Sequence, residues 1–173
     1  DRVFAYLDGM TTLQGAFTQV SPNGAATDGV FYLKRPGLLR FDYAPPSPLK
    51  IVANGGLVYV RDDKLETTDS YPLGQTPLKF LLKKRVEVSD IRVASVERTA
   101  DQVAVAFSSA DAQTEGRLVA VFAAPNLALK QWAIHDAQGG VTVVTLRDVV
   151  GGKNIPNRVF ATPETSSPFL KNQ

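Results

Sequence analysis

Apolar and polar residues alternate in short runs along most of this sequence, and turn-forming residues separate the runs. In residues 29–35, for example, Phe31, Leu33 and Arg35 fall on one face and their neighbours on the other. A period of two is typical of half-buried β-strands, whose successive side chains point to opposite faces of a sheet. Asn54-Gly55 lies between two such runs and is a strong signal for a tight hairpin turn. The pattern therefore predicts antiparallel strands joined by short turns.

Two segments depart from the alternation and predict helices. In residues 1–14, apolar side chains recur at spacings of three and four, at Val3, Leu7, Met10 and Leu13. Residues 76–84 predict a second, short helix, in which Thr76 is a candidate N-cap and Pro77 the first helical residue.

About ten or eleven short strands and these two helices define the expected fold class. The strands are not interleaved with helices, so a parallel doubly wound sheet is not expected. A sheet of so many strands must twist and curl, and a curled sheet has a concave face. The prediction is a mainly β fold with few helices: an incomplete antiparallel β-barrel, or strongly curved sheet, covered by a lid of short α-helices.

One domain is expected to span all 173 residues. Residues 1–14 form its N-terminal lid helix and residues 76–84 its second lid helix. Residues 151–173 contain three prolines and are expected to form a loose C-terminal segment, with one short strand at 158–161. The chain begins at Asp1, without a Met or an apolar leader, which fits a processed or trimmed chain from which a signal peptide has been removed.

Composition excludes several classes of function. The net charge of +2 is too small for the electrostatic footprint of a nucleic-acid-binding protein. No run approaches about 18 uninterrupted apolar residues, so no membrane-spanning helix is expected. The chain has no cysteine, which excludes disulfide and thiol chemistry, and its one histidine excludes a two-histidine metal site within one chain.

Residues able to carry catalysis are few. His135 lies in a predicted hairpin strand, where it is most simply a strand side chain, and Asp62-Asp63 is most simply a polar turn. Gly151-Gly152-Lys153 lacks the rest of a phosphate-binding loop. We therefore expect no enzyme activity, no catalytic residue, no metal and no cofactor.

Apolar side chains are the most informative feature of the predicted sheet. One face of its first strands carries Phe17, Phe31, Leu33, Leu39, Phe41 and Tyr43, and the second helix adds Leu78 and Leu81. Two interpretations stay open on pattern alone: a plain core beneath the helices, or an apolar cavity for a hydrophobic ligand. Arg35 falls on the same face, either as a strand-end side chain that reaches solvent or as a latch that donates hydrogen bonds to carbonyls of a covering helix.

Short motifs in residues 6–82 resemble, in order, those of the periplasmic outer-membrane lipoprotein carriers, the LolA family. Asn54 stands where the family has Asp, and Tyr59 where it has Trp. The matching motifs are Phe17-Thr18-Gln19, Gly29, Leu33-Lys34-Arg35-Pro36-Gly37, Arg40-Phe41-Asp42-Tyr43, Ile51-Val52-Ala53-Asn54-Gly55, Val58-Tyr59-Val60-Arg61-Asp62, and Thr76-Pro77-Leu78 followed by Leu81-Leu82.

This resemblance implies a function as well as a fold. It implies a periplasmic chaperone, expected to be a monomer, that holds the acyl chains of lipoproteins in an apolar cavity and carries them from the inner to the outer membrane. It implies that Arg35, which matches the arginine of the family's Lys-Arg-Pro motif, holds the lid shut. The implied partners are acylated lipoproteins as cargo, an inner-membrane ABC transporter complex and, as a further candidate, an outer-membrane acceptor lipoprotein. The alternative is a lipid-binding or envelope-sensing module of the same fold without protein cargo.

Overall fold

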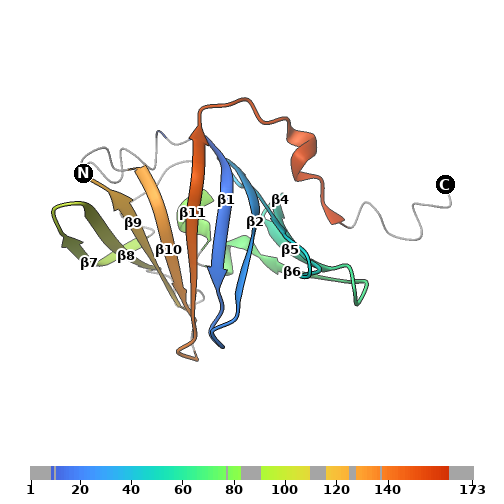
Figure 1. Ribbon diagram of the computed structural model, residues 1–173, viewed down its shortest axis with the longest axis horizontal. Coiled ribbons are helices and arrows are strands. Elements are labelled where there is room, and N and C mark those ends of the chain that lie inside the picture. The colour runs from blue at the N-terminus through green and yellow to red at the C-terminus, as the bar shows by residue number, and fades with distance from the viewer. Residues whose placement is uncertain are drawn as a thin grey trace.

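The computed structural model describes residues 9, 11–76, 78–82, 91–109, 116–124, 128–136 and 138–163 of the protein. Strands dominate these residues (Figure 1). The elements are β1 (Thr12–Val20), β2 (Ala26–Lys34), β3 (Leu38–Tyr43), β4 (Leu49–Asn54), β5 (Leu57–Asp62), β6 (Thr67–Pro72), η1 (Leu73–Gln75), α2 (Lys79–Leu82), β7 (Ile91–Arg98), β8 (Gln102–Ser109), β9 (Arg117–Ala123), β10 (Ala128–His135), β11 (Val141–Gly151) and η2 (Asn157–Phe160).

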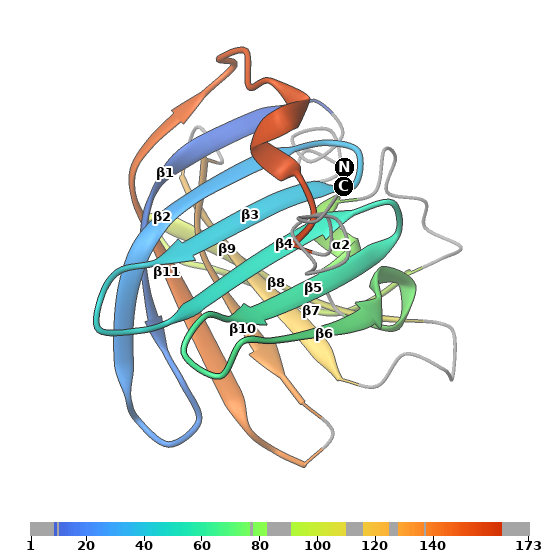
Figure 2. The same ribbon diagram turned by 90° about the vertical axis from the view of Figure 1, so that its right-hand side faces the viewer.

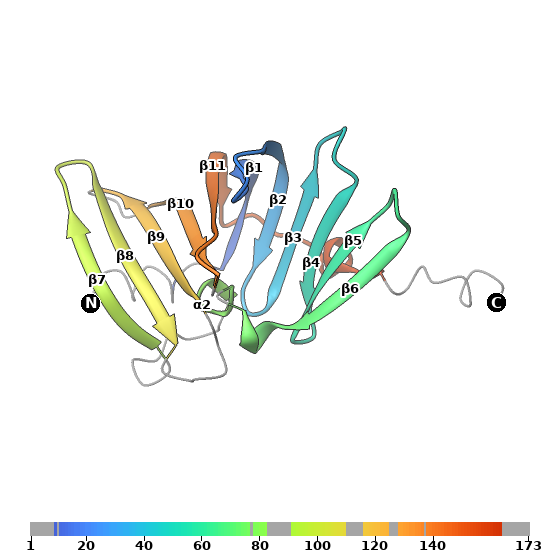
Figure 3. The ribbon, with the colours of Figure 1, turned by 90° about the horizontal axis from the view of Figure 1, so that it is seen from below.

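The eleven described strands form one sheet in the order β6-β5-β4-β3-β2-β1-β11-β10-β9-β8-β7. Each pair in the sheet is antiparallel. Strand β1 pairs with both β2 and β11 and so joins the two halves of the chain. The edge strands β6 and β7 lie at opposite ends of the row (Figure 3). The predicted antiparallel, open and strongly curved sheet is confirmed.

The sheet curls around one apolar face, which we call the concave face (Figure 2). In β1 and β2 the odd-numbered positions face this side, and Phe17, Phe31 and Leu33 there are fully buried. Leu81 and Leu82 of α2 belong to the same buried cluster, so this single helical turn packs within the curve. Because side chains alternate along each strand, the sheet has an apolar concave face that excludes water and an opposite face, which we call the convex face.

The C-terminal segment differs from the prediction. Residues 153–163 cross the convex face (Figures 1 and 2). The prediction of a strand at 158–161 is wrong, because Asn157–Phe160 form the 3-10 helix η2. Nor is this part loose, because Ile155 and Phe160 are fully buried. Three side chains of the sheet donate hydrogen bonds to backbone carbonyl oxygens of this C-terminal segment. Lys34 Nζ donates to Ile155 at 2.9 Å, Arg40 Nη1 to Val159 at 3.0 Å and Asn54 Nδ2 to Phe160 at 2.8 Å. Residues 164–173 lie outside the described residues.

The two expected lid helices are seen only in part. Residues 12–14 begin β1 instead of ending a helix, since Leu13 pairs with Leu33 on the concave face, while residues 1–8 and 10 lie outside the described residues. The hydroxyl of Thr76 donates to the carbonyl of Leu73 at 3.0 Å, and the described helix begins three residues later, at Lys79. Within the described part of 76–84, the helix comprises only Lys79–Leu82, and Pro77 and residues 83–84 are outside that part.

Candidate functional site

The apolar residues singled out from the sequence come together on the concave face. Leu78 is partly buried against this cluster, and the others are buried within it. The buried members are Phe17, Phe31, Leu33, Leu39, Phe41, Tyr43 and Leu81. Side chains from β1, β2, β3 and α2 therefore share one water-excluded region.

An aromatic group at the centre of this face ties distant strands together. Phe41 stacks on Phe17, with ring centroids 4.7 Å apart and an interplanar angle of 22°. On its other side it stacks on Trp132 of β10, at 5.9 Å and 24°. Phe31 and Tyr43 meet Phe41 edge-on, at 6.1 Å and 6.4 Å. The interior of the curved sheet is filled here by interlocking rings.

The second half of the chain supplies residues that the sequence reasoning did not select. Alternating apolar positions in β8, β9, β10 and β11 point to the concave face and join the same cluster. Their period-two spacing was the available signal, but alternation alone does not say which residue faces which across a curved sheet. These additional residues are Val103, Val105, Phe107, Leu118, Ala120, Phe122, Leu129, Trp132, Val144 and Leu146.

Near one end of the concave face lies a polar contact. The hydroxyl of Tyr43 donates to Gln19 Oε1 at 2.6 Å. Burial raises the pKa of Tyr43 to about 12, and the hydrogen bond to Gln19 opposes part of that rise. Gly29 lies between Phe17 and Tyr43 in the register of β1, β2 and β3, so no side chain separates these two rings. They meet edge-on at 5.1 Å.

Arg35 directly follows β2 and is buried. Its backbone N–H donates to the carbonyl of Thr11 at 2.8 Å, and the N–H of Gly37 donates to the carbonyl of Leu82 at 2.8 Å. One turn between β2 and β3 thus bonds to the residue before β1 and to the end of α2. This links the two segments in which the lid helices were predicted.

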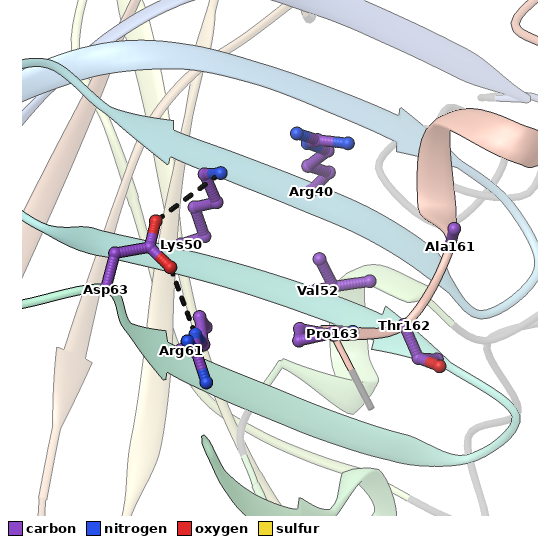
Figure 4. A pocket seen from close by; sticks show the side chains of 8 residues that line it. All are labelled: Arg40, Lys50, Val52, Arg61, Asp63, Ala161, Thr162 and Pro163. Carbon is purple, nitrogen blue, oxygen red and sulfur yellow. Dashed lines mark hydrogen bonds and ion pairs between the residues drawn. The ribbon is translucent and has the colours of Figure 1, made fainter. Parts of the chain in front are cut away.

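A hollow of about 340 Å³ lies on the convex face (Figure 4). Asp63 sits between two cations there, with Oδ1 at 3.0 Å from Arg61 Nε and Oδ2 at 3.5 Å from Lys50 Nζ. The hydrogen bond from Arg61, with the charge of Lys50, holds the pKa of Asp63 below its usual range. Arg40 Nε pairs with Asp42 at 2.8 Å. The hollow is lined by Arg40, Lys50, Val52, Arg61, Asp63, Ala161, Thr162 and Pro163.

The polar residues weighed as catalytic or metal-binding candidates occupy ordinary positions. Asp62 Oδ1 accepts hydrogen bonds from the backbone N–H groups of Lys64 and Leu65, at 2.9 Å each, so it shapes the turn after β5. His135 ends β10 as a partly exposed strand residue. Among the described residues, no three His, Cys, Asp or Glu side chains gather as metal ligands would. The helices of that same part of the chain are all too short to cross a membrane.

Comparisons with known proteins agree with this arrangement. A family model described as "Outer membrane lipoprotein carrier protein LolA" matches residues 8–163. The chain is 40% identical over 79 residues to the outer-membrane lipoprotein carrier protein of Methylococcus capsulatus, and 36% identical over 66 residues to that of Alkalilimnicola ehrlichii. These alignments cover 43% and 35% of this chain, but only 38% and 31% of the two relatives.

A solved structure shows the same fold at low identity. The LolA superfamily protein NE2245 from Nitrosomonas europaea superposes with a TM-score of 0.50 and 11% sequence identity. The superposition covers 94% of this chain and 97% of that one. At this identity the likeness concerns the fold alone.

Proposed function

The chain belongs to the outer-membrane lipoprotein carrier protein (LolA) family, whose model matches residues 8–163, and from this membership we propose that it is a periplasmic carrier of lipoproteins. In this proposal it binds the acyl chains of a lipoprotein and carries them from the inner to the outer membrane. Its partners are acylated lipoproteins, an inner-membrane ABC transporter complex and an outer-membrane acceptor lipoprotein, and it acts as a monomer without catalysis.

The observation that carries the proposal is the composition of the concave face. Both halves of the chain contribute aromatic and aliphatic side chains to one continuous cluster. Burial of a methylene group is worth about 0.8 kcal/mol, so a long acyl chain that entered this region would gain on the order of 10 kcal/mol. The acyl-binding residues that we propose are Phe17, Phe31, Leu33, Leu39, Phe41, Tyr43, Leu78 and Leu81.

A carrier must also release its cargo, and the filled interior supports that requirement. An entering acyl chain has to displace contacts such as the stack of Phe41 on Trp132. The free energy of these self-contacts is subtracted from the gain on burial of the chain, which keeps the affinity below that of a preformed empty cavity. We propose that the protein alternates between this self-packed state and an open, loaded state.

Arg35 is proposed as the latch of the self-packed state, where its turn contacts the segment before β1 and the end of α2. Its support is its burial beside the turn that bonds to both Thr11 and Leu82. A hydrogen bond from a charged donor is worth about 1.5–3 kcal/mol, which is a suitable size for a contact that must break when cargo enters.

A release experiment tests the carrier function. Purified protein is added to spheroplasts that are synthesising a labelled outer-membrane lipoprotein, and labelled lipoprotein is measured in the supernatant. Serum albumin, a non-specific binder of acyl chains, is the control at equal concentration. We expect release into a soluble complex well above the albumin level. Release no greater than with albumin would contradict the proposal and leave the lipid-binding or envelope-sensing alternative.

A further inference from the structure

Two hydrogen-bonding groups on the concave face are buried without a partner among the described residues. They are the indole Nε1 of Trp132 and the hydroxyl of Thr27. The side chain of Trp132 is only 1% exposed, and its neighbours Phe41 and Val144 are apolar. A buried donor without an acceptor is costly, and native proteins keep few of them.

The strand register places both groups in one row across the sheet. Trp132 of β10 is paired with Val144 of β11, Val144 with Gln19 of β1, and Gln19 with Thr27 of β2. Cross-strand partners lie on the same face, so all four side chains point to the concave side. Gln19 also accepts the hydrogen bond from Tyr43. This row, which we call the polar row, places the hydrogen-bonding side chains of Trp132, Gln19 and Thr27 in line across four strands of the concave face.

A second row, which shares β1 and β2 with the polar row and continues into β3 and β4, is entirely apolar. Leu13 of β1 is paired with Leu33 of β2, Leu33 with Leu39 of β3, and Leu39 with Ala53 of β4. All four side chains are buried. Gln19 lies six positions after Leu13 in β1, about 20 Å along the strand. This distance is comparable with the length of an extended long fatty acyl chain.

We infer that the polar row binds the acyl carbonyl oxygens of the lipid cargo, with Trp132 Nε1 and the Thr27 hydroxyl as donors. This inference rests on the proposed function and adds a polar contact and a direction to it. The carbonyl oxygens of esters and amides accept hydrogen bonds, so they match two unpaired donors. At the β1–β2 end of the polar row Gln19 and Thr27 are half-buried, whereas Leu13 and Leu33 of the apolar row on the same two strands are buried. The lipid therefore lies with its carbonyls at the polar row and its acyl tails toward Leu13, Leu33 and Leu39.

Two lipids that differ in one carbonyl group test this inference. Hexadecanoyl lysophosphatidylcholine has an ester carbonyl, and hexadecyl lysophosphatidylcholine has an ether in its place. Both are titrated calorimetrically, below their micellar concentrations, into the wild-type protein, Trp132→Phe and Thr27→Val. We expect the wild type to prefer the ester about fivefold to tenfold, as one net hydrogen bond implies. Each substitution should reduce this preference, and Trp132→Phe should bring it close to one.

Phe31→Leu is the matched control, because it alters a buried aromatic residue of the same face that has no polar atom. It should weaken the binding of both lipids and leave the preference for the ester unchanged. If Trp132→Phe does not fold, replacement of this single tryptophan by benzothienylalanine removes the N–H at nearly constant shape.

The outcomes separate this inference from the proposed function. Equal binding of the two lipids by the wild type would overturn the inference alone, as would an ester preference that persists without the Trp132 N–H. Binding of neither lipid would overturn the proposed function and the inference together.

Discussion

Phe41 of β3 and Trp132 of β10 stack with their ring centroids 5.9 Å apart, although β2, β1 and β11 lie between their strands in the sheet. Neighbouring strands are about 4.8 Å apart, so in a flat sheet these residues would be separated by about 19 Å. The two rings can stack only because the sheet curls strongly between β3 and β10. The stack also shows that the interior is occupied by the protein's own side chains in this state.

Replacement of Phe41 by alanine removes both of its stacked contacts, on Phe17 and on Trp132. Loss of a buried phenylalanine leaves a cavity that the surrounding strands fill only in part, so we expect the free energy of unfolding to fall by about 3–5 kcal/mol. Urea denaturation followed by circular dichroism measures it. Tyr71→Ala is the control, because Tyr71 is 50% exposed on the edge strand β6, and it should change stability by about 0.5 kcal/mol or less. Equal losses in the two variants would argue against the stack as a core contact.

Tyr43 predicts a loss of stability at alkaline pH. Burial raises its pKa to about 12 in the folded state, against a value near 10 in the unfolded chain. The folded state therefore keeps the phenolic proton over a pH range in which the unfolded state has lost it. The contribution is complete below about pH 10 and disappears as pH rises through about 12, in total roughly 2–3 kcal/mol.

Denaturant unfolding at intervals from pH 8.5 to 12, for the wild type and Tyr43→Phe, isolates this contribution. The variant should be less stable at neutral pH, because Gln19 loses its donor, and it should lose less stability on the way to pH 12. Parallel pH profiles for the two proteins would show that Tyr43 titrates normally.

Gly29 of β2 is predicted to tolerate no side chain. A Cβ atom there would collide with the carbonyl oxygen of Asp42 on β3 and lie 3.0 Å from Cε1 of Phe17. We expect Gly29→Ala to cost about 3 kcal/mol, since either the pairing of β2 with β3 or the aromatic group must shift. Gly74→Ala is the matched control, because a Cβ at Gly74 meets nothing within 4 Å. Thermal unfolding of the two variants decides the point, and a Gly29→Ala protein as stable as Gly74→Ala would refute the prediction.

The features that could be predicted from the sequence are those that local alternation determines. Phe31, Leu33 and Phe41 share a face because strand side chains alternate, whatever the sheet does elsewhere. The hairpin between β4 and β5 follows from its turn residues, because Asn54 pairs with Leu57 and the two glycines between them, Gly55 and Gly56, both have positive φ.

The features that could not be predicted depend on contacts between distant segments. Trp132 faces Phe41 only because the whole sheet curls, and no local pattern gives the extent of that curvature. Phe160 is buried on the convex face, where Arg40 and Asn54 donate hydrogen bonds to the carbonyl oxygens of Val159 and Phe160, over sequence separations of 119 and 106 residues. Its neighbourhood, rich in proline and polar residues, looks like a loose tail when taken alone.

Arg35→Leu tests the proposed latch. In the proposed latch the guanidinium stabilises the self-packed state, so cargo should enter more readily and leave less readily when it is removed. In the spheroplast assay the variant should release lipoprotein from the inner membrane at least as well as the wild type. Its transfer of that lipoprotein to isolated outer membranes should be several-fold slower. Arg35→Lys, which keeps the charge but not the planar fork of donors, should be intermediate. Transfer at the wild-type rate by Arg35→Leu would exclude the latch.

Trp132 allows a direct measurement of where an acyl chain lies, because it is the single tryptophan of the chain and lies at the centre of the concave face. A tripalmitoylated cysteinyl lipopeptide with brominated acyl chains is titrated into the protein while tryptophan fluorescence is recorded, and the same lipopeptide without bromine is the control. Bromine quenches only at short range, so a chain bound in the interior should quench Trp132 progressively and saturably. Lipopeptide that binds, as measured by equilibrium dialysis, but quenches no more than its unbrominated control would contradict acyl binding on the concave face.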